Sequence, residues 1–72
     1  MSSIEIKSQM TGSLWKLNIK EGEEVKKGQE VAILESMKME IPIEADEGGT
    51  VKEIKFAEGD FIDEDDVVVV LE

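Results

Sequence analysis

The residue most open to chemistry in this chain is Lys38, an amine flanked by two methionines in the run Glu35-Ser36-Met37-Lys38-Met39. The chain contains no cysteine and no histidine, so it lacks the commonest thiol nucleophile, general base and metal ligands. Ser36 beside Glu35 therefore forms no catalytic triad, and we expect no catalytic residue and no enzymatic activity. Taken alone, Met-Lys-Met also fits an ordinary exposed lysine beside methionines that fill core gaps.

An acidic run, Asp63-Glu64-Asp65-Asp66, is the other cluster of potential ligands. It lacks the spaced oxygen ligands, central glycine and distal glutamate of a calcium-binding EF-hand loop. We therefore predict a solvated turn there and no metal site.

Composition narrows the class of partner. The 72 residues carry a formal net charge of −10, with most of the excess acid in the second half: residues 1–37 hold 6 acids and 5 lysines, and residues 38–72 hold 12 and 3. This charge argues against nucleic acid and anionic membranes as partners. Solubility is the simpler explanation of the acidity, and a basic partner surface is the alternative.

With no long apolar run and no signal-like start, we expect a cytoplasmic protein.

The elements that position Lys38 emerge from an internal repeat with an offset of 37 residues, in which Gly12 falls on Gly49. Residues 12–19 match residues 49–56 in their apolar pattern, and residues 1–35 overlay residues 38–72 without a gap. Trp15 falls on Lys52, so it should face outward or lie half buried. Ordinary packing is the simpler interpretation of this tryptophan, and a contact surface is the alternative.

Period-2 apolar segments separated by turn residues predict eight short strands. They lie at 4–6, 13–17, 24–25, 31–35, 41–43, 50–54, 61–62 and 67–71. The glycines at 12, 22, 28, 48, 49 and 59 are expected to supply the positive φ angles that tight turns need. Asp65 occupies the position equivalent to Gly28 in the second copy, and we expect a positive φ there too. Residues 31–41 are also rich in helix formers, but 31–34 align with the β-branched run 68–71 and Pro42 blocks a helix.

The predicted fold is all-β: one domain, residues 1–72, folded as a flattened eight-stranded barrel or sandwich of two pseudo-two-fold related four-stranded halves. In such an arrangement the Met37-Lys38 junction is equivalent to the gap between the termini. Residues 36–39 should therefore form a tight connection at the end remote from Met1 and Glu72, with Lys38 at a hairpin tip.

The segment around Lys38 resembles the biotinyl-domain signature Glu-Ala-Met-Lys-Met, and the resemblance covers essentially the whole chain. It implies a flattened barrel in which Lys38 carries covalent biotin, Met37 and Met39 are the flanking recognition residues and Glu35 opens the motif. Ser36 departs from the usual alanine. The resemblance also implies a biotin carboxyl carrier, which shuttles an activated carboxyl group between biotin carboxylase and carboxyltransferase after a biotin protein ligase has modified it.

Two alternatives remain open. Lipoyl domains share this fold and attach lipoate to the equivalent lysine, usually within Asp-Lys-Ala or Asp-Lys-Val, so the methionines favour biotin while lipoate, or both cofactors, stays the alternative. An unmodified β-barrel interaction module is the other reading, although such a module does not need Met-Lys-Met at its tip.

Overall fold

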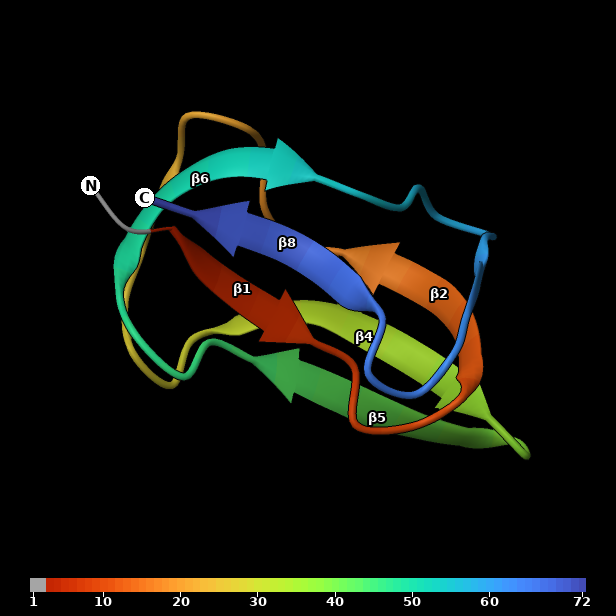
Figure 1. The fold of residues 1–72 in the computed structure, drawn as a ribbon. Helices are drawn as coiled ribbons and strands as arrows, with labels where there is room; N and C mark the ends of the chain where they lie inside the picture. The colour runs from red at the N-terminus through yellow and green to blue at the C-terminus, as the bar shows by residue number, and fades with distance from the viewer. Residues whose placement is uncertain (1–2) are drawn as a thin grey trace.

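The computed structural model describes residues 3–72, which form eight β-strands and no helix (Figure 1). The strands are β1 (Ile4–Lys7), β2 (Gly12–Leu17), β3 (Glu24–Val25), β4 (Glu30–Ser36), β5 (Met39–Glu44), β6 (Gly49–Ile54), β7 (Phe61–Ile62) and β8 (Val67–Leu71). The predicted all-β fold is confirmed, and the helix that residues 31–41 could have formed does not exist. No helix among the described residues could cross a membrane.

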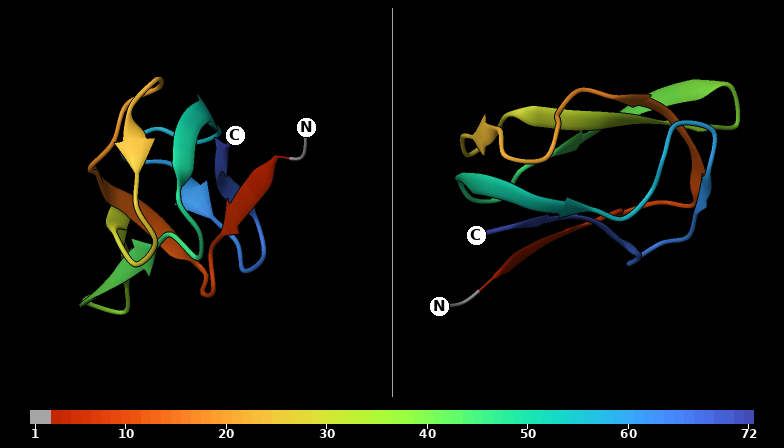
Figure 2. Two further views of the ribbon diagram at one scale, coloured as in Figure 1. Left: turned by 90° about the vertical axis from the view of Figure 1, so that its left-hand side faces the viewer. Right: turned by 90° about the horizontal axis from the view of Figure 1, so that it is seen from above.

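The strands form two four-stranded antiparallel sheets, which lie as two layers in the right-hand view of Figure 2. One sheet has the order β1-β8-β6-β3 and the other β5-β4-β2-β7. Exchanging each strand for its repeat equivalent converts one order into the other, as a two-fold axis requires. Each sheet nevertheless takes two strands from each half of the sequence, so the halves interlock instead of forming one sheet each.

The repeat extends to the register of the pairing. Leu14 pairs with Leu34 and Lys16 with Ile33, so that Trp15 is the extra residue of a bulge. At positions 37 residues later, Val51 pairs with Leu71 and Glu53 with Val70, which places Lys52 in an equivalent bulge. The prediction that the two copies share one structure is therefore confirmed for the described residues, while Met1 and Ser2 lie outside them.

The core lies between the two sheets and is made of inward-facing aliphatic side chains. Two of the four inner strands, β4 and β8, contribute most to it, and nearly the whole of the run Val67–Leu71 is buried. The fully buried large side chains include Ile6, Leu14, Val25, Val31, Leu34, Ile62, Val68, Val69 and Leu71. Because the chain has no cysteine to form a disulfide, burial of apolar area is the main stabilising contribution to this fold.

The glycines have two different roles, and the sequence predicted only one of them. Gly22, Gly28 and Gly59 do adopt positive φ angles, and Asp65, the equivalent of Gly28, has a φ of 72°. The expectation of positive φ was wrong for the glycines at 12, 48 and 49, which lie at or beside strand starts. Gly12 is instead required by close approach, because a Cβ there would lie 2.5 Å from the Glu35 carbonyl oxygen.

A candidate modification site at a hairpin tip

The hairpin of β4 and β5 ends in a two-residue turn formed by Met37 and Lys38. Cross-strand pairing continues as far as Ser36 opposite Met39, which makes both strands longer than the sequence predicted. Met37 has a φ of 51° and Lys38 a φ of 66°. Two successive positive φ angles are the pattern of a type I′ turn, which is normally occupied by Asn-Gly or Asp-Gly.

Methionine and lysine are both unfavourable in a type I′ turn. A side chain with a Cβ pays roughly 1–2 kcal/mol for the left-handed conformation, and neither methionine nor lysine has the short polar group that eases it. An uncommon backbone conformation occupied by poorly suited residues is a reason to suspect a function. Turn propensity therefore does not explain the presence of Met37 and Lys38 at the tip.

All three tip side chains are exposed to solvent. Met37 is 91% exposed and Met39 is 60% exposed, so neither belongs to the core. Lys38 is also exposed, and within residues 3–72 its amine takes part in no ion pair. The amine is therefore free to be approached, with an apolar side chain on either side.

The tip lies at one end of an elongated molecule. The principal extents are 37 × 18 × 17 Å, and Figure 1 shows the β4–β5 hairpin projecting at the opposite end from the C-terminus and the start of β1. The prediction of a tip remote from Glu72 is confirmed, and the part concerning Met1 lies outside the described residues. The pseudo-two-fold axis makes this turn equivalent to the end of the molecule that carries the C-terminus and the start of β1.

Glu35 lies close to the turn of the same hairpin, directly opposite Glu40, in the second residue pair from the turn. Both carboxylates are exposed, and like charges facing each other across a sheet are unfavourable. All four residues predicted for the site, Glu35, Met37, Lys38 and Met39, are thus brought together in one hairpin. Glu40 completes the acidic base of the tip, and the symmetric position of the two glutamates about the turn is the signal for it in the sequence.

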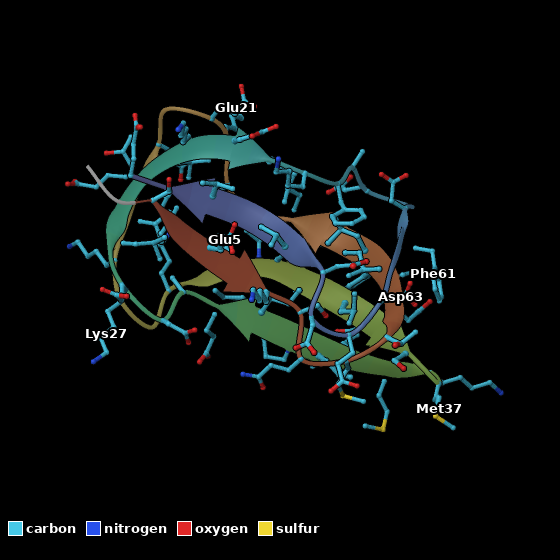
Figure 3. All side chains as sticks on the ribbon, viewed as in Figure 1. Glu5, Glu21, Lys27, Met37, Phe61 and Asp63 are labelled. Carbon is cyan, nitrogen blue, oxygen red and sulfur yellow. The ribbon has the colours of Figure 1, made fainter. Side chains whose placement is uncertain are left out.

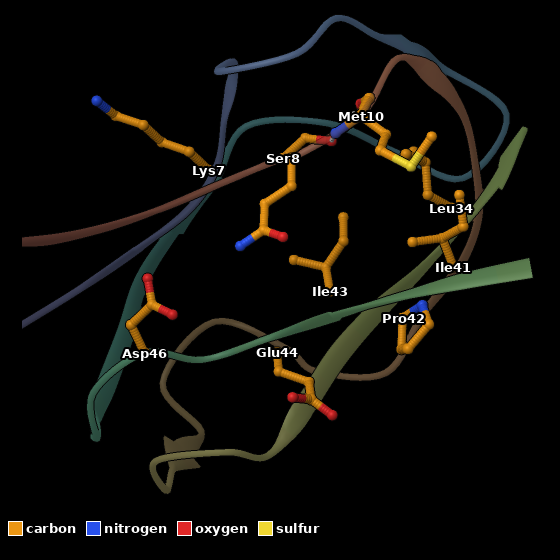
Figure 4. A pocket seen from close by; sticks show the side chains of 10 residues that line it. Lys7, Ser8, Met10, Leu34, Ile41, Pro42, Ile43, Glu44 and Asp46 are labelled. Carbon is orange, nitrogen blue, oxygen red and sulfur yellow. Dashed lines mark hydrogen bonds between the residues drawn. The ribbon is translucent and has the colours of Figure 1, made fainter.

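A small cavity lies elsewhere, between the edge strands β1 and β5 (Figure 4). Its volume is about 180 Å³, and it is bordered by Lys7, Ser8, Met10, Ile41 and Asp46 among others. None of the predicted site residues lines it. Since ligand pockets usually measure about 300–1,000 Å³, this cavity is too small to be the main site.

The acidic run at 63–66 forms a turn. The Asp63 backbone N–H donates to the Asp66 carboxylate at 2.9 Å, and the equivalent Lys26 N–H donates to the Gln29 side chain at 3.0 Å. Residues 3–72 contain no group of three or more potential ligands that could hold a metal ion. The carboxylate of Asp66 is therefore explained by turn formation.

Comparison with known proteins agrees with this geometry. Residues 3–71 match the biotin/lipoyl family model, described as "Biotin-requiring enzyme". The chain is 64% identical over 63 residues to the "Biotin/lipoyl attachment protein" of Bacillus subtilis, covering 88% of this chain and 86% of that protein. It is 37% identical over 71 residues to the mitochondrial propionyl-CoA carboxylase alpha chain of Homo sapiens, of which it spans 10%.

The fold recurs in a solved structure as well. All of this chain superposes on 6% of the urea carboxylase of Kluyveromyces lactis with a TM-score of 0.92 and 32% sequence identity. The chain thus corresponds to a small part of these carboxylases and to nearly the whole of the Bacillus subtilis relative. The family match, the relative that is matched over most of its length and the shared fold establish that the chain belongs to the biotin/lipoyl attachment domain family.

Proposed function

We propose that residues 1–72 act as a single carrier domain whose Lys38 is covalently modified with biotin by a biotin protein ligase. The observation that carries this proposal is the Met37-Lys38 turn, in which two residues unsuited to positive φ hold an unpaired amine at the end of the molecule. Covalent attachment needs an accessible amine and not an enclosing pocket, and Lys38 meets that requirement.

The attachment is an acyl transfer. The ligase presents biotin as an activated acyl-adenylate, and the Lys38 Nζ, once it has lost a proton, attacks the carboxyl carbon. An amide C–N bond forms, the C–O bond to the phosphate of AMP breaks, and AMP leaves. Because lysine amines are almost entirely protonated at pH 7, the nitrogen loses two protons in all, one before the attack and one as the amide forms, and the ligase or the solvent must accept both.

After attachment, the carrier presents the cofactor to two enzyme sites in turn, biotin carboxylase and carboxyltransferase. Biotin supplies a ureido nitrogen that accepts and releases the carboxyl group, and this chemistry belongs to the cofactor. The chain contributes the position of the cofactor. The tip lies at one end of the molecule, and the Lys38 side chain holds biotin away from the sheets. The carboxylases among the relatives support this role.

Lipoate is the second candidate cofactor. The name of the Bacillus subtilis relative includes both groups, and an accessible lysine at a hairpin tip suits either. The methionines beside Lys38 are the reason for placing biotin first. An unmodified interaction module would need no accessible lysine at the tip, and transfer of biotin to Lys38 in the experiment below would exclude it.

The test is mass spectrometry of the whole chain after incubation with a biotin protein ligase, biotin and ATP. We expect the mass of one biotin, which peptide mapping should place on Lys38. Lys38→Arg should abolish the added mass, and Lys52→Arg, which changes a lysine of the other sheet, should not. Biotin on Lys26, Lys27 or Lys52 instead, or full modification of Lys38→Arg, would overturn the proposal.

A further inference from the structure

The outer faces of the two sheets differ in chemistry although their backbones are equivalent. Trp15 is 43% exposed on β2, and the same bulge on β6 carries Lys52. Phe61 is 62% exposed on β7, and its equivalent on β3 is Glu24. The pairing of Phe61 with Ser13 corresponds to that of Glu24 with Thr50. The backbone therefore does not require aromatic side chains at these positions, since charged residues occupy them in the other copy.

Trp15 and Phe61, together called the aromatic patch here, belong to the sheet that bears the tip. Phe61 is opposite Ser13, and Ser13 is opposite Glu35, which lies near the turn of the hairpin. With neighbouring strands about 4.8 Å apart and a rise of about 3.3 Å per residue, Phe61 lies within roughly 15 Å of Lys38. Figure 3 shows Phe61 and Met37 at the same end of the molecule, away from Lys27.

Carboxylates lie between the aromatic patch and the tip. Glu35 and Glu40 continue the row that begins with Phe61 and Ser13, and both are exposed. Aromatic side chains surrounded by polar ones are typical anchors of protein interfaces, in which a few residues supply most of the affinity. The complementary surface would carry apolar hollows for the aromatic rings and basic groups facing the glutamates.

We infer that the aromatic patch is the surface on which the ligase that modifies Lys38 docks. This inference rests on the proposed function. Before modification there is no cofactor arm to hold, so the ligase can bind only the protein surface, whereas enzymes that use the modified carrier also bind the arm. A standard interface buries about 800 Å² on each partner, equivalent to a disc of roughly 16 Å radius. Centred on Lys38, such an interface reaches the aromatic patch.

The experiment exchanges the aromatic side chains for those of the other copy. In Trp15→Lys with Phe61→Glu, each new residue is the one that the equivalent backbone position already tolerates, and the net charge is unchanged. The matched control is Lys52→Glu with Glu24→Lys on the other sheet, which also leaves the net charge unchanged. Steady-state kinetics of biotin transfer by a biotin protein ligase are measured for both variants and for the wild type.

We expect the exchange of Trp15 and Phe61 to raise the KM for the carrier at least tenfold while kcat stays within about threefold. The KM of the control should remain within twofold of the wild type. Circular dichroism at the assay temperature verifies folding, and Phe61→Glu alone, at the more exposed position, should raise KM at least threefold. A KM within twofold of the wild type for folded Trp15→Lys with Phe61→Glu, or for folded Phe61→Glu alone, would overturn the inference. Failure of the wild type to accept biotin would instead reject the proposed function itself.

Discussion

Met37 and Met39 leave most of their side-chain surface in water, so burial in the core does not explain them. Methionine is flexible and polarizable, and it adapts to apolar hollows of varied shape. Two of them flank Lys38 in the chain, and the fold gains little from either.

The double variant Met37→Asp with Met39→Ala tests whether these residues select the cofactor. It creates the Asp-Lys-Ala sequence typical of lipoyl domains, and we expect a lower ratio of biotin transfer to lipoate transfer. The stability cost should stay within about 0.5 kcal/mol, as is usual for surface changes. Aspartate also tolerates the positive φ of position 37 better than methionine does.

The measurement pairs a biotin ligase and a lipoate ligase with both proteins and records thermal unfolding of each. Much earlier unfolding of the variant would mean that the methionines support the core. An unchanged transfer ratio would shift cofactor selection to Glu35 and Glu40, the acidic pair below the tip.

The hairpin of β4 and β5 keeps its place because β2 packs tightly against it at Gly12. A Cβ on Gly12 would lie 2.5 Å from the Glu35 carbonyl oxygen, while one on the equivalent Gly49 would lie 3.1 Å from the Glu72 carbonyl oxygen. The first spacing forces a shift of backbone, and the second needs a smaller adjustment. These equivalent glycines therefore form a natural pair for comparison.

We predict that Gly12→Ala destabilises the domain by about 1–3 kcal/mol, the usual range for overpacking, and that Gly49→Ala costs less. Neither glycine has a positive φ, so backbone strain does not complicate the comparison. Urea unfolding at equilibrium measures both costs. An equal or larger loss for Gly49→Ala would show that the approach of β2 to Glu35 is not the constraint.

The strands themselves were well predicted from the sequence, because each carries alternating apolar residues and the 37-residue repeat supports each assignment twice. The repeat also decided the one ambiguous segment: residues 31–34 form part of β4, as their alignment with the β8 residues predicted. Strand ends were less well placed. Residues 39 and 40 extend β5 to the turn, because backbone pairing continues as far as Ser36 opposite Met39.

Other features required the structure. A sequence repeat states which strands are equivalent but not which strands pair, so the interlocking of the halves was not predictable. The positive φ angles at Met37 and Lys38 contradict the conformational preferences of methionine and lysine, and no local sequence pattern predicts these angles. Glycine is needed at position 12 because the backbone there lies close to Glu35, which is 23 positions later in the chain. The four residues of the candidate site were found together because they lie in one motif.

The interlocking also changes how the charge is distributed. Most of the acidic excess belongs to residues 38–72, which would suggest one acidic half if the two copies folded separately. Since each sheet takes strands from both copies, the second copy does not form an acidic layer of its own. The net charge of −10 therefore acts as a general repulsion between molecules, and local recognition must come from smaller features such as the tip.

The two ends of the molecule are equivalent under the pseudo-two-fold axis, although one carries a turn and the other the C-terminus and the start of β1. Ile4 pairs with Leu71 as Ile41 pairs with Leu34, so β1 and β8 form an unclosed counterpart of the β4–β5 hairpin. A short linker can close that counterpart, and the original turn can be opened in its place. The fold should survive this exchange because every paired strand is retained.

We predict that a circular permutant, with Glu72 joined to Met1 through an Asn-Gly-containing linker and new ends at Met37 and Lys38, folds but loses biotin acceptance. Lys38 is still present, yet the turn that holds its amine between two methionines is gone. Cooperative thermal unfolding would demonstrate the fold, and mass spectrometry after ligase treatment would measure acceptance. A second permutant with the same linker, opened between Glu21 and Gly22, keeps the hairpin intact and should accept biotin. Full modification of the first permutant would mean that the ligase reads the segment around Lys38 without its turn, and the geometry of the tip would then lose its functional meaning.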